Sequence, residues 1–177
     1  MLIKLSVMKK CLILLPALFL CSISLYAQNV KFNDLVYYSN LANGDVFNAL
    51  RDGRKFKQDF TTDVNGQEVE YFKSVTPKKG DIYAKADTEK INVGRYTKLY
   101  DGTLLRTVNY TSTNKQYILN MISQAKRYGL LMKFQGTDKS NNIYLFDNDY
   151  YHVSIYLSRN PTYGGLVEIK QKEFLGE

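Results

Sequence analysis

The sequence contains a single histidine, His152, and only two cysteines, Cys11 and Cys21, both close to the N-terminus. With one histidine, no two-histidine metal site can form within one chain, and a Ser-His-Asp triad would have to use His152 as its base. The sequence also has no P-loop and no G-x-G-x-x-G or G-x-S-x-G motif. These absences exclude most of the common catalytic and metal-binding chemistries.

The first 27 residues have the pattern of a secretory signal peptide. Met8-Lys9-Lys10 precedes an apolar run from Cys11 to Leu25, and Ala27 then supplies a small residue before polar Gln28. This run of about 15 residues is shorter than the roughly 20 that a membrane-spanning helix needs. We therefore predict cleavage after Ala27, no membrane span in the mature chain, and translation that begins at Met8.

Two features of this segment refine the prediction. Cys21 follows bulky Leu20, and because lipidated cysteines need a small residue before them, we do not expect Cys21 to carry a lipid. The Met-Lys-Lys start and the exit Leu25-Tyr26-Ala27-Gln28 resemble export signals of Bacteroidota. That resemblance implies a Gram-negative source and a periplasmic or extracellular location, and nothing about function.

Removal of residues 1–27 changes the composition. Lys4, Lys9 and Lys10 are lost with no acidic residue, so the net charge falls from +7 to +4, and both cysteines are lost as well. The mature chain then has no disulfide framework, no thiol nucleophile and no thiolate metal site. Its weak positive charge and predicted export make nucleic acid a poor candidate partner.

Most of the mature chain is predicted to form strands. Asn65-Gly66 and Asp101-Gly102 are dipeptides that favour two-residue hairpin turns, and Asn141-Asn142, Asp147-Asn148-Asp149 and 161–165 are further turn signals. Apolar and polar residues alternate from Tyr151 to Ser158, as in a half-buried strand. The predicted strands are 54–62, 67–74, 91–100, 103–111, 130–136, 141–147, 150–159 and 164–172, with a possible short ninth at 79–88.

Two regions are predicted to be helical. In the first, Asn33 caps a helix that runs to about Ala42, and after an interruption at Asn43-Gly44-Asp45 the helix resumes up to Gly53. The second begins with a capping box at Thr113-Asn114-Lys115-Gln116 and ends at Gly129. Its apolar residues recur at spacings of three and four: Tyr117, Ile118, Met121, Ile122 and Ala125.

The order of elements predicts two units in tandem, 28–112 and 113–177, each a helix followed by four strands. Short segments correspond between the units, such as Val69-Glu70-Tyr71-Phe72 with Ile143-Tyr144-Leu145-Phe146. The expected fold is α+β, with helices packed on one face of antiparallel sheet within one compact domain. This layout resembles the tandem repeats of secreted β-lactamase-inhibitor-type proteins. Those proteins have disulfides that this chain lacks, and a single helix on a longer meander is the alternative.

The candidate binding residues are aromatic. Tyr96, Tyr144 and Tyr156 alternate with apolar residues on predicted strands, and His152 is expected on the solvent-facing side of its strand. A sheet surface is a natural place for tyrosine, and a cluster on one face could hold a sugar or a protein. We therefore take these four residues as a possible binding surface.

The acidic residues give no comparable signal. Asp147-Asn148-Asp149 and Asp63-Val64-Asn65-Gly66 each contain part of a calcium loop but lack its further ligands, and turn formation explains both. Asp147, Asp149 and Glu168 could supply an acid/base pair, yet no spacing singles them out. We assign no catalytic residue, no metal site and no cofactor.

The sequence thus favours an exported, non-catalytic binding module that holds a protein or glycan of the envelope or exterior through a sheet face bearing tyrosines. Two alternatives stay open: a small carboxylate-dependent glycan hydrolase and a structural envelope protein. A concave pocket with two converging carboxylates would favour the hydrolase.

Overall fold

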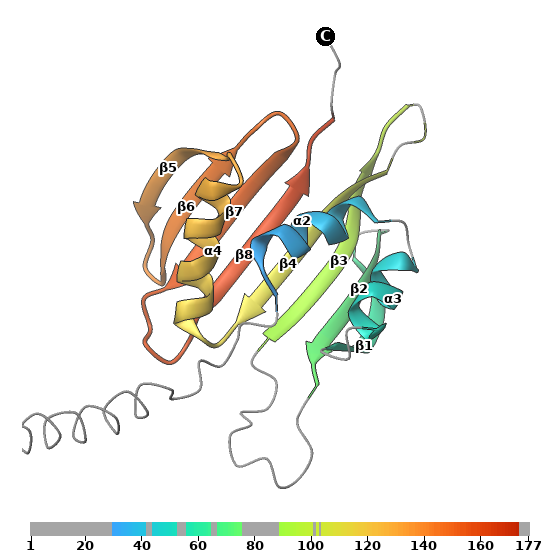
Figure 1. The fold of residues 1–177 in the computed structure, drawn as a ribbon, viewed down its shortest axis with the longest axis horizontal. Coiled ribbons are helices and arrows are strands. Elements are labelled where there is room, and N and C mark those ends of the chain that lie inside the picture. The colour runs from blue at the N-terminus through green and yellow to red at the C-terminus, as the bar shows by residue number, and fades with distance from the viewer. Residues whose placement is uncertain are drawn as a thin grey trace, which may run out of the picture.

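The protein folds as α+β: in the part of the chain that the structure describes, three helices lie on one face of an eight-stranded antiparallel sheet (Figure 1). The computed structural model describes residues 30–41, 44–52, 56–64, 67–75, 89–100, 102 and 104–173. The predicted signal segment, the Asn65-Gly66 turn and the possible ninth strand at 79–88 lie outside these residues.

All eight predicted strands are confirmed, with ends that differ by at most two residues. In chain order they are β1 (Phe56–Val64), β2 (Gln67–Ser74), β3 (Glu89–Lys98), β4 (Leu104–Ser112), β5 (Leu131–Thr137), β6 (Asn141–Asp147), β7 (Tyr151–Ser158) and β8 (Gly165–Gln171).

The strand order is β1-β2-β3-β4-β8-β7-β6-β5. The sheet therefore consists of two four-stranded meanders that join where β4 pairs with β8, from Ser112 opposite Gly165 to Thr107 opposite Lys170. This order is compatible with two tandem units, but the sequence correspondence between 28–112 and 113–177 stays a prediction.

The helices are α2 (Phe32–Asn40), α3 (Asp45–Asp52) and α4 (Lys115–Arg127). The α4 prediction is one residue early at its start, because Asn114 and not Thr113 is the N-cap, and its side chain accepts a hydrogen bond of 3.0 Å from the Gln116 amide. The predicted stop is confirmed, since Gly129 has a φ of +91° and its amide donates to the Lys126 carbonyl.

Two other local predictions are wrong. Helix α2 is capped by Lys31 and not by Asn33: the Lys31 amide donates to Asp34 Oδ2 at 2.7 Å, which places an acidic side chain in the first turn. Asn141-Asn142 does not form a turn but begins β6. The turn lies just before it, where Asp138 Oδ1 accepts hydrogen bonds from the amides of Ser140 and Asn141.

The hydrophobic core lies between the helices and the sheet. Buried positions alternate along β7 at Tyr151, Val153, Ile155 and Leu157, as predicted. Helix α2 contacts β4 and β8, α4 contacts β7 and β8, and α3 contacts β1. The opposite face of the sheet has no helix on it in the described part of the chain, and we call it the open face.

Hydrogen bonds fix α2 at the centre of the helical layer. The Phe32 amide donates to Gln124 Oε1 of α4 at 2.7 Å. At the other end of α2, Asn40 Nδ2 donates to Tyr151 Oη at 2.7 Å and Asn40 Oδ1 accepts from Gln171 at 2.9 Å. These contacts join the first helix to strands of the second meander, so the described elements share one core.

Candidate functional site

The open face is organised by strand register. Because cross-strand partners lie on the same side of an antiparallel sheet, the pairings define rows that run across the strands. One row crosses the open face on all eight strands in the order Lys57, Lys73, Lys90, Thr111, Leu166, Tyr156, Ile143 and Gly136. Lysines occupy three of the four positions on β1 to β4, and apolar or aromatic residues occupy three of the four positions on the other strands.

A wide, shallow groove lies at the middle of this row. Its volume is about 550 Å³, and its lining residues come from β3, β4, β6, β7, β8, the segment after β4 and the loop before β8. Among them are two tyrosines, a lysine, an asparagine and several hydroxyl residues: Tyr156, Tyr163, Lys90, Asn141, Thr111, Ser112, Thr113 and Ser158. Tyr163 is 61% exposed, so one of the two rings is free to contact a ligand.

The loop before β8 holds Tyr163 in place at the groove. Asn160 Oδ1 accepts hydrogen bonds from the Thr162 amide at 3.0 Å and from the Thr162 hydroxyl at 2.8 Å, and the Tyr163 amide donates to the Asn160 carbonyl. Gly164 is packed so closely that an added Cβ would lie 2.3 Å from the Ser112 carbonyl oxygen. The loop is thereby fixed against the end of β4.

The structure separates the four predicted binding residues. Tyr156 lies on the open face and lines the groove. Tyr144 does not share that face with Tyr156: it pairs with Ile155, which is fully buried, and packs against the core on the opposite face. Tyr96 belongs to β3, but its side chain lies outside the described part of the structure.

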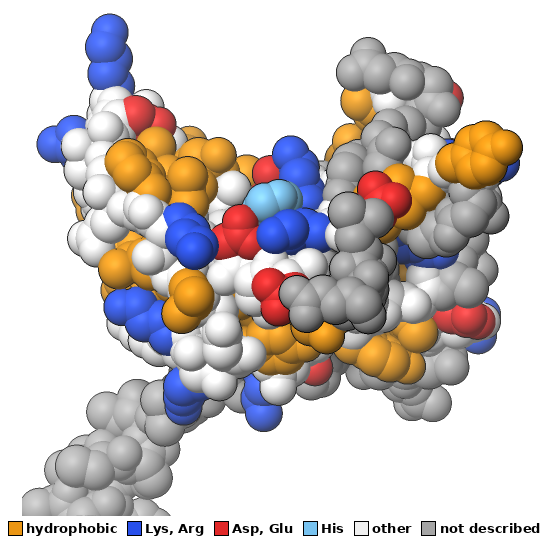
Figure 2. All heavy atoms as spheres, turned by 90° about the horizontal axis from the view of Figure 1, so that it is seen from above, with side chains coloured by type: hydrophobic (Ala, Val, Ile, Leu, Met, Phe, Trp, Pro, Cys, Tyr) orange, Lys and Arg blue, Asp and Glu red, His pale blue; other side chains and the backbone are white. Residues whose placement is uncertain are grey.

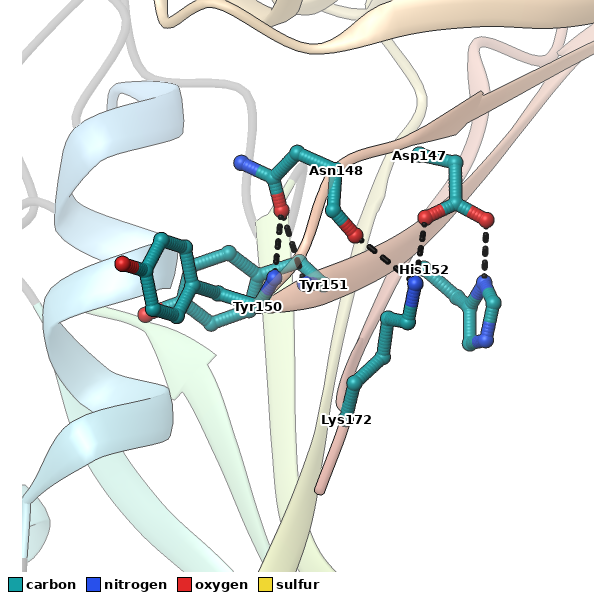
Figure 3. A network of polar contacts seen from close by, with 6 residues as sticks. All are labelled: Asp147, Asn148, Tyr150, Tyr151, His152 and Lys172. Carbon is teal, nitrogen blue, oxygen red and sulfur yellow. Dashed lines mark hydrogen bonds and ion pairs between the residues drawn. The ribbon is translucent and has the colours of Figure 1, made fainter. Parts of the chain in front are cut away.

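His152 lies on the open face, at the end of β7 away from the groove (Figure 3). Its Nδ1 is 2.9 Å from Asp147 Oδ2, and Lys172 Nζ is 2.9 Å from Asp147 Oδ1. Lys172 also donates to the Asn148 carbonyl at 2.8 Å. The cluster therefore ties the β6–β7 turn to the end of β8.

The charge of Asp147 follows from these contacts. Partial burial acts to raise its pKa, but the hydrogen bond from Lys172 and the neighbouring charges of His152 and Lys172 outweigh burial, so the pKa lies below its usual value. Asp147 is therefore ionised, and its two carboxylate oxygens contact His152 and Lys172. This arrangement stabilises the turn between β6 and β7. The other predicted carboxylate on this face, Glu168, forms an ion pair with Lys170 at 3.2 Å.

Aromatic side chains also stand on both flanks of the open face. On the first flank, Phe60 of β1 stacks on Tyr71 of β2 with ring centroids 4.4 Å apart. On the second, the Phe134 ring covers Gly136, since an added Cβ on that glycine would lie 2.4 Å from the ring. Figure 2, a view from the end at which His152 lies, shows the histidine at the surface among basic and acidic side chains.

The groove offers binding groups but no pair of carboxylates. No Asp or Glu is among the residues that line it in the described structure. Likewise, the described residues contain no group of three His, Cys, Asp or Glu side chains placed to hold a metal ion. What the lining provides is two aromatic rings, hydroxyls, an amide and one ammonium group.

The sequence identified Tyr156 but not the other important groups of the groove. Tyr163 lies in a segment whose Pro and Gly residues indicate a turn, and Lys90 stands beside Lys73 and Lys57 only through the strand register. The alternation along each strand, combined with a correct register, is the signal that would have found the lysine row.

Comparison with family models, with curated proteins and with solved structures gives no match to this chain. Within the described residues, the longest helix has 13 residues, and none has the length and apolar character needed to cross a bilayer.

Proposed function

We propose that the protein is an exported, non-catalytic binding module that holds a protein or glycan through the open face of its sheet. Its groove, which Tyr156 and the exposed ring of Tyr163 line together with hydroxyl and amide side chains, is the observation that carries the proposal. Export rests on the signal-like residues 1–27, and the place of action would be the periplasm or the surface of a Gram-negative bacterium.

Binding fits this surface better than catalysis does. Aromatic rings on a fixed sheet supply contact area with little loss of side-chain entropy, and they are enriched at recognition sites. A carboxylate-dependent hydrolase would need two carboxylates that converge on one substrate. On the open face Asp147 and Glu168 each form an ion pair with a lysine, and neither lines the groove.

The test compares how ligand retention changes when a tyrosine ring is removed from the open face and when one is removed from the helical layer. Residues 28–177 are immobilised as wild type, Tyr156→Ala and Tyr163→Ala, and each is used on a glycan array and in pull-downs from envelope extracts. Tyr37→Ala is the matched control, because this tyrosine is 56% exposed and belongs to α2 in the helical layer.

We expect the wild type and Tyr37→Ala to retain the same ligand and the two groove variants to lose it. Retention that is equal in all four proteins would contradict binding through the groove. Retention of nothing by the wild type would remove the binding proposal altogether.

A further inference from the structure

Three lysines stand side by side on the open face. Lys57 of β1 pairs with Lys73 of β2, and Lys73 pairs with Lys90 of β3, so their Cα atoms follow one another at the strand spacing of about 4.8 Å. Asp59 forms an ion pair with Lys73, whereas Lys57 and Lys90 are exposed. Asp59 already balances the charge of the middle lysine, so an anion bound along the row is attracted mainly to the ammonium groups of Lys57 and Lys90.

The lysine row leads into the groove. Lys90 belongs both to the row and to the groove lining, and its next neighbours across the sheet are Thr111 and then Leu166 and Tyr156. A ligand that contacts the tyrosines therefore reaches the lysines if it extends across β4 toward β1. The surface is long, shallow and charged at one end, which suits a polymeric ligand better than a small molecule.

The chemistry of the lining favours a glycan over a peptide. A pyranose ring has an apolar C–H face that packs on an aromatic ring and a rim of hydroxyls that hydrogen bond to side chains such as Asn141, Ser158 and Thr111. An extended peptide commonly binds by adding a strand at a sheet edge. Strands β3, β4, β8 and β7 have neighbours on both sides, so their backbone groups are already paired.

We propose that the open face binds an anionic glycan, a polysaccharide that carries carboxylate or sulfate groups. Its sugar rings lie against Tyr156 and Tyr163, and its acidic groups contact Lys90 and Lys57. This inference rests on the proposed function, whose own test does not depend on the charge of the ligand.

The experiment measures binding of residues 28–177 to three acidic glycans by titration calorimetry: oligogalacturonate, alginate oligomers and chondroitin sulfate oligomers. The uncharged methyl ester of oligogalacturonate is the matched ligand. The variants are Lys90→Gln and the double variant Lys57→Gln/Lys90→Gln. The control is Lys126→Gln, the same change at an exposed residue of α4.

We expect at least one acidic glycan to bind. Lys90→Gln should weaken it about fivefold, which corresponds to one exposed ion pair, and the double variant should weaken it further. Lys126→Gln should change nothing, and added salt should weaken wild-type binding.

Two results would overturn the inference. In the first, the methyl ester binds as tightly as the acid and the lysine variants bind as tightly as the wild type, so the charge of the glycan does not contribute to binding. If Tyr163→Ala still loses binding in that case, the proposed function stands although the inference about charge fails. In the second, none of the acidic glycans binds, so the proposed class of ligand is wrong. The proposed function still stands in that case if the wild type retains a ligand in the earlier screen and Tyr163→Ala loses it.

Discussion

Replacing Tyr110 with phenylalanine tests the polar contact at the centre of the core. Tyr110 lies on β4 between β3 and β8, is 0% exposed, and donates its hydroxyl to Glu89 Oε1 at 2.6 Å. Glu89 is itself 1% exposed. Burial, followed by the neighbouring carboxylate, raises the pKa of Tyr110, so the hydroxyl stays protonated and remains a donor.

The magnitude follows from what the substitution removes. Phenylalanine keeps the ring and its packing, so Tyr110→Phe removes the hydroxyl, with its hydrogen bond to the buried Glu89 carboxylate and its side-chain hydrogen bond with Ser112. A hydrogen bond to a charged group contributes about 1.5–3 kcal/mol, and we expect the free energy of unfolding to fall by that amount. Because the two residues share one contact, Glu89→Gln combined with Tyr110→Phe should cost less than the sum of the single changes.

Urea unfolding of residues 28–177, followed by circular dichroism, gives these free energies. Tyr163→Phe is the control, since that residue is 61% exposed and loss of its hydroxyl should change stability by less than about 0.5 kcal/mol. A Tyr110→Phe protein within about 0.5 kcal/mol of the wild type, or additivity with Glu89→Gln, would show that the hydrogen bond between Tyr110 and Glu89 does not stabilise the fold.

Three further predictions concern a cap, a charge and a glycine. Asn114→Ala removes the α4 cap and should lower stability by about 1 kcal/mol in urea unfolding, with Asn114→Ser largely restoring it. The pKa of Asp147 is lower in the folded protein than in the unfolded chain, where it is about 3.9. The ionised carboxylate therefore stabilises the fold at pH values above about 3.9, and this stabilisation is lost as the pH falls through the pKa of the folded protein. Asp147→Asn should therefore destabilise by less than about 1 kcal/mol at pH 7, and by progressively less as the pH falls below about 3.9. A loss of stability that does not change with pH would argue against the ion pair with Lys172. Gly165 has a φ of +145°, and an added Cβ would lie in contact with the Tyr156 carbonyl oxygen. Gly165→Ala should thus lower stability by about 3 kcal/mol and shift the amide signals of Tyr156, and a protein as stable as the wild type would contradict the β8 geometry.

Much of the fold could be predicted because local patterns and packing agree. Alternation in β7 places Val153 and Ile155 in the core, and the spacing of Ile118, Met121 and Ile122 does the same in α4. Predictions failed where two polar residues compete for one local role. Asn114 caps α4 in place of Thr113, and Asp138 rather than Asn141-Asn142 makes the turn before β6.

The candidate site was harder to predict because it depends on contacts between strands distant in sequence. Tyr144 and Tyr156 look alike in sequence, yet they lie on opposite faces because Tyr144 pairs with Ile155 and Tyr156 pairs with Ile143. The same register brings Lys57, 33 positions before Lys90 in the sequence, into one row with it. No local pattern contains that information.

Binding on the open face is tested most directly by amide chemical-shift mapping of residues 28–177 with a ligand retained in the screens. If the ligand lies in the groove, the perturbed amides cluster at the start of β3, the ends of β4 and β7, and the loop that carries Tyr163. The amides of α2 and α4 then stay unchanged. Perturbations confined to the helical layer or to the β5 edge would contradict binding on the open face.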